Sequence, residues 1–293
     1  MTGAATPLDR KWIAANPLPV HGSGTTKNSR GRVLAIGGSR IVPGALRLTG
    51  EAALRAGAGK LQMATVESAA LLGLFVPEAA TIALPEDEDG EIAAGPGSRL
   101  ETALDACGAL VIGPGIGKPD AAQRLLDLIL RQPGADMTLV VDAMAIGCAR
   151  DMRKQLAPLS GRLVFTPHYG EMAILTGQDE DDIAADPFAI ASRVAADYGA
   201  IVVLKGSDTV IAAPDGALLH YVGGGSGLAT GGSGDVLAGA IAGLLSRGAP
   251  PLVAAGWGVW LHGESGRRVA AATGPIGFLA RELPAEFPRL LPQ

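Results

Sequence analysis

The chain has 293 residues, of which 48% are hydrophobic and 4% aromatic, and its formal net charge is −5. The hydrophobic content is enough for a large core and excludes a disordered chain, while the scarcity of aromatic residues favours a sheet filled by Ala, Val, Ile and Leu over an all-β sandwich. Because the charge is negative and no dense Lys or Arg run occurs, nucleic acid is not expected as a partner.

The N-terminal residues predict neither a leader nor an anchor. The sequence MTGAATPLDRKW has no apolar signal segment, and no later apolar stretch reaches the ~18 residues that a membrane span needs. We therefore expect a soluble, cytoplasmic protein that does not bind membranes. Residues 1–30 form a polar lead-in that is expected to pack outside or to exchange with a neighbouring subunit. Cys107 and Cys148 lack CxxC spacing, so reduced thiols are expected.

From residue 32 onward, short apolar runs alternate with longer helical patterns. The runs predicted as strands are Arg32–Ile36, Leu61–Val66, Ala109–Ile112, Leu139–Val141, Leu163–Phe165 and Ile201–Leu204. Several are apolar at successive positions, as strands covered on both faces should be. The alternation predicts parallel strands joined by crossover helices, in one α/β domain that covers residues 1–293.

Other segments interrupt or follow this alternation. The acidic stretches 85–91 and 177–187 are predicted to be solvated loops. Residues 210–222 contain two strand-like halves about Pro214, Asp215 and Gly216, which predicts an antiparallel hairpin. After residue 233 the pattern becomes helical, over Asp235–Leu245 and Leu252–Ala271, so the C-terminal part is expected to form a helical layer.

The strongest local signal is the sequence GGGSGLATGGSGD at residues 223–235, directly before a predicted helix. Backbone N–H groups of such a loop can approach an anion, and the helix N-terminus adds positive partial charge, so phosphate is the expected ligand. Neither GxxxxGK[ST] nor GxGxxG is present. Asp235 is predicted to be the catalytic base that takes a proton from a hydroxyl attacking phosphorus, with a helix cap as the alternative.

Four further segments follow predicted strands, at the sheet edge where open α/β folds bind ligands. They are GGSRIVPGA at 37–45, GPGIGKP at 113–119, TPHYGE at 166–171 with His168, and LKGSDT at 204–209 with Lys205. Each alone also fits an ordinary strand-to-helix turn, a local cap or a lysine that guards a sheet edge.

Taken in order, GGS..PGA, GPGIG, TPHYGEM, LKGSDTV and ATGGSGD resemble the ADP-dependent NAD(P)H-hydrate dehydratases, a branch of the ribokinase-like superfamily, over roughly residues 30–280. The resemblance implies a central, mainly parallel sheet with helices on both faces, a stand-alone dehydratase without an epimerase domain, and a homotetramer. It also implies a hydro-lyase that uses ADP, with ATP as the alternative donor, to convert the S epimer of NADH or NADPH hydrate to NAD(P)H; with ADP the other products are AMP and phosphate.

The resemblance assigns roles to individual residues. Asp235 would be the base and would contact the hydrate, together with Ala45, Gly115 and His168. The adenine nucleotide would be bound by Lys205, Gly206, Ser207, Asp208, Thr209 and Gly234. Mg²⁺ is expected because a transferring phosphoryl group usually needs a cation between its oxygens, although no spacing identifies its ligands.

The sequence departs from the family pattern in three places, one of which is that Gly223 to Gly225 stand where an Asn often precedes the Gly-rich loop. Tyr169 stands where the family commonly has Pro, and DAMAIG at 142–147 places Met144 and Gly147 where polar residues are common. These changes affect local packing and the positioning of ligands. They leave Asp235, His168 and Lys205 in place.

Two other functions remain open from the sequence. A small-molecule kinase of the same superfamily, for hydroxymethylpyrimidine or a thiazole, would also need a Gly-rich loop that ends in an acid, although TPHYGE argues against it. A non-catalytic nucleotide-binding protein is the second alternative, and Asp235 argues against it. The reaction product separates these cases, because a kinase accumulates a stable phosphoester.

Overall fold

The computed structural model describes residues 5–95, 97–131, 134 and 136–292. They form a ten-stranded sheet in the order β1-β10-β9-β8-β7-β6-β5-β2-β3-β4. The strands are β1 Thr6–Pro7, β2 Arg32–Ile36, β3 Lys60–Val66, β4 Ala79–Leu84, β5 Ala109–Ile112, β6 Thr138–Val141, β7 Leu163–Phe165, β8 Ala200–Leu204, β9 Asp208–Ala212 and β10 Leu218–Val222. Neighbouring strands are parallel except that β9 runs antiparallel to both β8 and β10.

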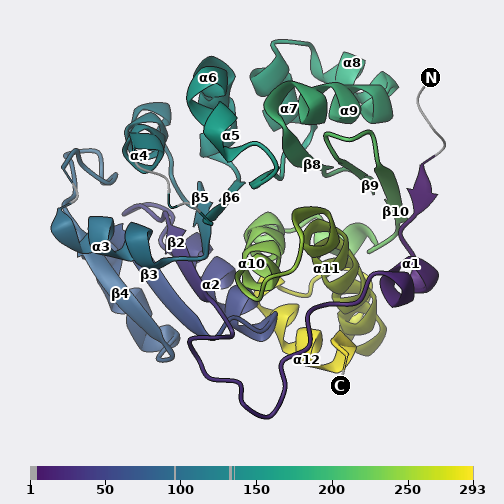
Figure 1. The fold of residues 1–293 in the computed structure, drawn as a ribbon, viewed down its shortest axis with the longest axis horizontal. Coiled ribbons are helices and arrows are strands. Elements are labelled where there is room, and N and C mark those ends of the chain that lie inside the picture. The colour runs from purple at the N-terminus through teal and green to yellow at the C-terminus, as the bar shows by residue number, and fades with distance from the viewer. Residues whose placement is uncertain (1–4, 96, 132–133, 135, 293) are drawn as a thin grey trace.

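Helices cover both faces of this sheet (Figure 1). One layer contains α1 Arg10–Ala15, α2 Gly44–Arg55, α10 Ser233–Ser246, α11 Pro251–Thr273 and α12 Phe287–Leu290. The other contains α3 Ser98–Ala106, α4 Pro119–Arg131, α5 Met144–Cys148, α6 Arg153–Leu156, α7 Tyr169–Thr176, α8 Glu180–Ala185 and α9 Pro187–Tyr198. Short 3-10 helices lie at Glu67–Phe75, Ala149–Met152, Ala157–Leu159, Ser226–Leu228, Ala280–Glu282 and Pro284–Glu286.

Each central strand contributes to two cores because successive side chains point to opposite faces. In β2, Val33 and Ala35 belong to the core under α10 and α11, whereas Leu34 and Ile36 belong to the core under α4 and α5. All four side chains are fully buried. This arrangement explains the continuous apolar runs, and it confirms the predicted α/β sheet with helices on both faces.

Helix α10 lies directly against α2 because small residues let the two backbones approach. A Cβ atom at Gly239 would overlap the carbonyl oxygen of Thr49, and one at Gly243 would overlap that of Ala53. This contact fixes α10 over the sheet, with its first residue at the carboxyl ends of the strands.

All six predicted strands are present, each within one residue of its predicted start, and the hairpin at Pro214–Gly216 is confirmed as β9 and β10. The sequence did not predict β4, whose Ala-rich run AATIAL has weak strand propensity and lies at the sheet edge. It also did not predict the two-residue β1.

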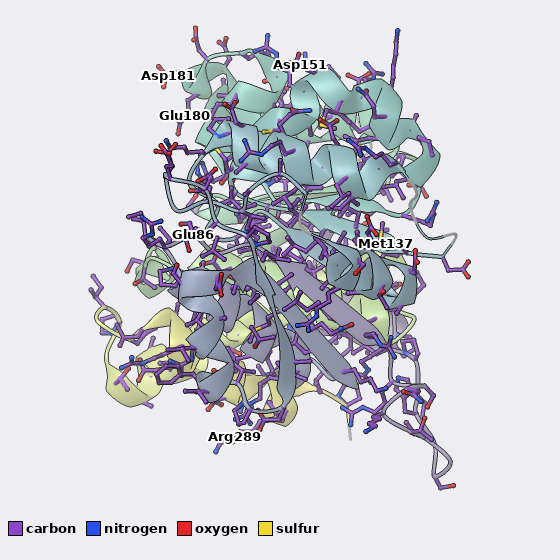
Figure 2. All side chains as sticks on the ribbon, turned by 90° about the vertical axis from the view of Figure 1, so that its left-hand side faces the viewer. Glu86, Met137, Asp151, Glu180, Asp181 and Arg289 are labelled. Carbon is purple, nitrogen blue, oxygen red and sulfur yellow. The ribbon has the colours of Figure 1, made fainter. Side chains whose placement is uncertain are left out.

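The prediction of a solvated loop at 177–187 was wrong over its central part, where α8 spans Glu180–Ala185. Acidic residues in the first turn of a helix interact favourably with its dipole, and Ile183 is fully buried beneath them. Glu180 and Asp181 project outward from the surface (Figure 2). The prediction for 85–91 was wrong for Glu91, which is 4% exposed and accepts a hydrogen bond from the Gly117 amide at 2.9 Å.

Within residues 5–31, the polar lead-in packs on the outside of its own chain. Strand β1 pairs with β10, Trp12 lies against Gly256 of α11, and the indole of Trp257 donates to the Asn16 carbonyl at 2.7 Å. Both Cys107 and Cys148 are free thiols, as predicted. In the described part of the chain, no helix combines the length and the apolar character needed to cross a membrane.

Candidate functional site

The carboxyl ends of five adjacent parallel strands meet at one edge of the sheet. The last residues of β2, β5, β6 and β7 are in register, and the last residue of β7 pairs with Val202, two residues before the end of β8. The loops that follow them, at 37–45, 113–119, 142–147, 166–171 and 205–209, therefore lie side by side. This is the position that the strand-end rule predicts for a ligand site in an open α/β sheet.

The Gly-rich loop brings a set of free backbone donors to this edge. Gly232 adopts φ of 89°, a left-handed conformation that favours glycine, and α10 begins immediately after it. The amides of Thr230, Gly231, Gly232, Gly234 and Asp235 donate no hydrogen bond within the described residues. Unpaired amides at the start of a 14-residue helix form a site for an anion such as phosphate.

Three charged side chains gather behind these amides. The ammonium of Lys205 lies 3.1 Å from Oδ1 of Asp142 and 3.7 Å from Oε2 of Glu171. Asp142 is 1% exposed and also accepts a hydrogen bond from the Thr166 hydroxyl at 2.7 Å. Lys205 follows β8, which has a strand on each side, so it does not guard a sheet edge. Burial alone would lower the pKa of Lys205, but Asp142 and Glu171 raise it above its ordinary value.

Asp235 carries one of the free amides, and its carboxyl group is close enough to these three charged groups to interact with each of them. Burial raises the pKa of Asp235 to about 7, the negative charges of Asp142 and Glu171 add to the increase, and Lys205 opposes it. A carboxylate with a pKa near neutrality is suited to act as a general base. Asp235 makes no side-chain hydrogen bond in the described part of the chain and α10 has no side-chain cap, which disfavours the helix-cap alternative.

The predicted nucleotide segment forms a turn beside the same helix start. Gly206 and Ser207 are exposed, whereas Asp208 and Thr209 begin β9. A Cβ atom at Gly234 would lie 3.3 Å from the Lys205 ammonium, so α10 and this turn are in contact. Gly234 thus lies next to the side chain of Lys205, the first residue of the predicted nucleotide segment.

Two details fix this turn. A Cβ atom at Gly206 would lie 2.8 Å from the phenol oxygen of Tyr169, so the phenol covers one side of the glycine. The imidazole of His220 lies 3.0 Å from the carboxylate of Asp208.

The predicted hydrate-binding residues are divided between two places, because His168 forms an isolated parallel β-bridge with Lys205, whereas Ala45 and Gly115 lie in the loops that follow β2 and β5. Gly115 adopts φ of 73°, and a Cβ atom there would lie 3.0 Å from Ala45, so the loops at 37–45 and 113–119 touch. A Cβ atom at Gly232 would overlap Leu48 of α2, so the first half of that helix is in contact with the Gly-rich loop. His168 caps α7 by accepting from the Glu171 amide at 3.3 Å, and its side chain is 59% exposed.

The segment 142–147 is strained where it leaves the sheet. Ala143 has φ of 50° and ψ of −132°, and within the described residues it is the one residue other than glycine with positive φ. Such strain costs about 1–3 kcal/mol and concentrates at functional sites. Gly147 packs against Ile174, and Met144 begins α5 partly buried, so the departures from the family pattern are accommodated.

The sequence did not identify every group that the site contains. Glu171 was inside the quoted TPHYGE segment, yet its contact with Lys205 depends on the order of β7 and β8. His262, from α11, lies 2.8 Å from the Ser233 hydroxyl, and no motif around it predicted this contact. In both cases the partners meet only through the tertiary fold.

Comparisons with known proteins identify the family of the chain. The family described as NAD(P)H-hydrate dehydratase matches residues 33–289. The ADP-dependent (S)-NAD(P)H-hydrate dehydratase of Xanthomonas campestris is 46% identical to the chain, over 95% of this chain and 93% of that protein.

Two solved structures have a similar fold. A ribokinase-like superfamily protein from Enterococcus faecalis gives a TM-score of 0.81 at 28% identity, over 93% of this chain and 90% of that one. The ADP/ATP-dependent NAD(P)H-hydrate dehydratase of Bacillus subtilis, co-crystallised with ATP/Mg²⁺, gives 0.79 at 29% identity over 98% of each chain. The mainly parallel sheet described above is thus of the ribokinase-like type.

Proposed function

The chain belongs to the NAD(P)H-hydrate dehydratase family, and from this premise we propose that it is a hydro-lyase that repairs the S epimer of NADH or NADPH hydrate with ADP as phosphoryl donor. The observation that carries the proposal is the position of Asp235. Its carboxylate, with a pKa of about 7, lies next to free amides that suit a phosphoryl group. The X. campestris relative carries the same activity in its name.

The chemistry needs two steps because hydroxide is a poor leaving group. First, Asp235 accepts the proton of the C6 hydroxyl, the hydroxyl oxygen bonds to the β-phosphorus of ADP, and the bond from that phosphorus to the bridging oxygen breaks, which releases AMP. The C6–O bond then breaks and phosphate leaves. The ring nitrogen supplies its lone pair, and loss of a proton from C5 restores the dihydropyridine double bond.

The remaining predicted residues have places in this scheme. Gly234 and the segment from Lys205 to Thr209 would bind the nucleotide, because their exposed backbone and the Lys205 ammonium lie beside the free amides. Ala45, Gly115 and His168 would bind the hydrate, with His168 beside Lys205 at the border of the nucleotide segment. In this proposal the hydroxyl of the hydrate would lie between Asp235 and the transferring phosphorus.

Mg²⁺ fits the same corner of the site. The described residues contain no group of three or more His, Cys, Asp or Glu side chains that could hold a metal ion. Mg²⁺ commonly uses only one or two carboxylates with phosphate oxygens and water, and Asp142 and Glu171 offer two carboxylates beside Lys205. These residues would hold the ion together with the nucleotide. When bound, Mg²⁺ neutralises charge on the phosphate oxygens.

One experiment tests the reaction and the donor together. The purified protein is incubated with the S hydrate and Mg²⁺, and with either ADP or ATP. We expect the reduced-nicotinamide absorbance to return and phosphate to be released. A stable phosphoester would instead identify a small-molecule kinase, and nucleotide binding without phosphate release would identify a non-catalytic protein.

Assembly and location follow from the resemblance alone. We propose a homotetramer in the cytoplasm, built from a single domain per chain. Light scattering coupled to size-exclusion chromatography measures the assembly, and a monomer at micromolar concentration would contradict it.

A further inference from the structure

Helix α10 is tied at its first residue to helix α11. Ser233 is 6% exposed, and its hydroxyl lies 2.8 Å from Nε2 of His262. The two residues are 29 positions apart in the chain. Neither has a part in the proposed reaction, and both lie next to groups that do.

Ser233 is the one residue in the sequence GGSG, residues 231–234, that has a side chain beyond a hydrogen atom. The other three positions are glycines, which have no side chain to restrain the backbone. Glycine also loses more conformational entropy on folding than any other residue. The only side-chain restraint available within GGSG is therefore the Ser233 hydroxyl. Its partner decides how firmly the amides of Gly234 and Asp235 are held.

His262 is well suited to be that partner. Burial lowers the pKa of His262, a hydrogen bond with the Ser233 backbone opposes this effect, and the nearby Lys205 charge adds to it; the resulting pKa is about 4, so the ring is neutral at pH 7. A neutral imidazole accepts from or donates to a hydroxyl at one nitrogen without adding charge to the site. Helix α11 itself is closely packed against α10, since a Cβ atom at Gly258 would overlap the side chain of Ile241. His262 thus extends from a rigid support.

We infer that His262 is a positioning residue whose hydrogen bond to Ser233 holds the amides of Gly234 and Asp235 in the geometry needed by the transferring phosphoryl group of ADP. The inference deepens the proposed function and rests on it. His262 touches neither substrate in this scheme. It acts through Ser233 on the helix start.

The test compares four variants. His262→Leu removes the ring nitrogens, His262→Gln keeps a polar group near the position of Nε2, Ser233→Ala removes the hydroxyl, and the fourth combines Ser233→Ala with His262→Leu. We expect His262→Leu and Ser233→Ala each to lower kcat at least ~10-fold, below the ~100-fold typical of losing a direct oxyanion donor, with KM for the hydrate changed less than ~3-fold. His262→Gln should recover most of kcat. The double variant should be within ~2-fold of the slower single variant, because both remove the same bond.

A matched control removes another histidine. His21 lies in the segment between α1 and β2, close to Arg247 at the opposite end of α10, so His21→Leu should leave kcat within ~2-fold of wild type. Thermal unfolding confirms that each variant is folded. If His262→Leu does not fold, His262→Gln and Ser233→Ala decide the question by their kcat values.

The outcomes separate the inference from the proposed function. If the fold-losses in kcat of the two single variants multiply in the double variant, the inference is wrong and the proposed function stands. The same holds if folded Ser233→Ala and His262→Leu keep the wild-type kcat. If the wild-type protein forms no NAD(P)H, the proposed function fails, and the dissociation constants for Mg-ADP decide the inference. They should rise at least ~5-fold in His262→Leu and Ser233→Ala and recover in His262→Gln, and unchanged constants would overturn it.

Discussion

Asp235 must be ionised to accept a proton, yet its surroundings favour the neutral carboxylic acid. Burial, Asp142 and Glu171 all raise its pKa, while Lys205 alone among these neighbours opposes them. The residue is therefore half ionised near neutrality in the free protein. A base in this range accepts a proton in the reaction and releases it again at each turnover.

This balance predicts the pH dependence of the reaction. Because the ionised carboxylate is the active form, kcat/KM for the hydrate should rise with pH through an apparent pKa of about 7. Asp235→Asn should lower kcat at least ~100-fold and largely keep the affinity for ADP. Stopped or continuous assays between pH 5 and 9 measure the profile. A flat profile, or near-normal turnover in Asp235→Asn, would remove Asp235 from the mechanism.

Lys205 offers a second test at this scale. Lys205→Met removes the cation that faces Asp142 and Glu171, so two mostly buried carboxylates lose their partner. We expect the free energy of unfolding to fall by about 2–4 kcal/mol and ADP to bind at least ~10-fold more weakly. Denaturant titration and calorimetry measure the two effects. An unchanged ADP dissociation constant would contradict the proposed nucleotide role.

At the scale of elements, the approach of α10 to α2 determines where the free amides lie. Gly239→Ala places a methyl group against the Thr49 carbonyl oxygen, so the helices must separate. We expect a loss of roughly 2 kcal/mol or more in the free energy of unfolding. Gly44→Ala in α2 is the matched control because open space surrounds that position, and its effect should stay within ~1 kcal/mol. Equal effects of the two substitutions would show that the close contact is not needed.

Elements with two buried faces were the ones that the sequence predicted best. The run from Ile201 to Leu204 is apolar at every position, and β8 is buried at every position. Strand β4 and helix α8 were missed because their sequences contain alanine or acidic residues, whose local preferences are weak there. For such segments the packing against neighbours decides the structure.

The site was predictable as far as the strand-end rule reaches. The rule located all the loops that carry Ala45, Gly115, His168 and Lys205, and the Gly-rich loop indicated Asp235. Contacts between loops were not predictable, because they depend on which strands are neighbours. Lys205 and Asp142 are 63 positions apart and meet only because β6, β7 and β8 are adjacent.

For the molecule as a whole, Asp235 links stability to pH. Its pKa is about 7 in the folded chain and 3.8 as the ordinary value, so between these values the folded form holds a proton that the unfolded form has released. Stability therefore falls as pH rises from about 4 to 7, and above that range the full cost of the buried charge is present. Asp235→Asn removes this cost. We expect its melting temperature to exceed that of wild type by several degrees at pH 8 and by little at pH 4.

Calorimetric scans at the two pH values measure this difference. If the difference in melting temperature between wild type and Asp235→Asn were the same at both pH values, the Asp235 carboxylate would be ionised in the folded protein well below neutrality. His262, whose pKa is about 4 in the folded chain and 6.5 as its ordinary value, also links stability to pH, but it is present in both proteins and so cancels in the difference between them.

The order in which the chain supplies the site has a consequence for synthesis on the ribosome. The acids and the lysine behind the phosphate position are complete once residue 205 has emerged, whereas the donor amides follow at 230–235 and their anchor at 262. A nascent chain halted between these points lacks the donor amides, and it also lacks part of the helical layer that covers one face of the sheet. Only translation through α11 makes the chain competent for its ligand, so premature termination there leaves a product without partial activity.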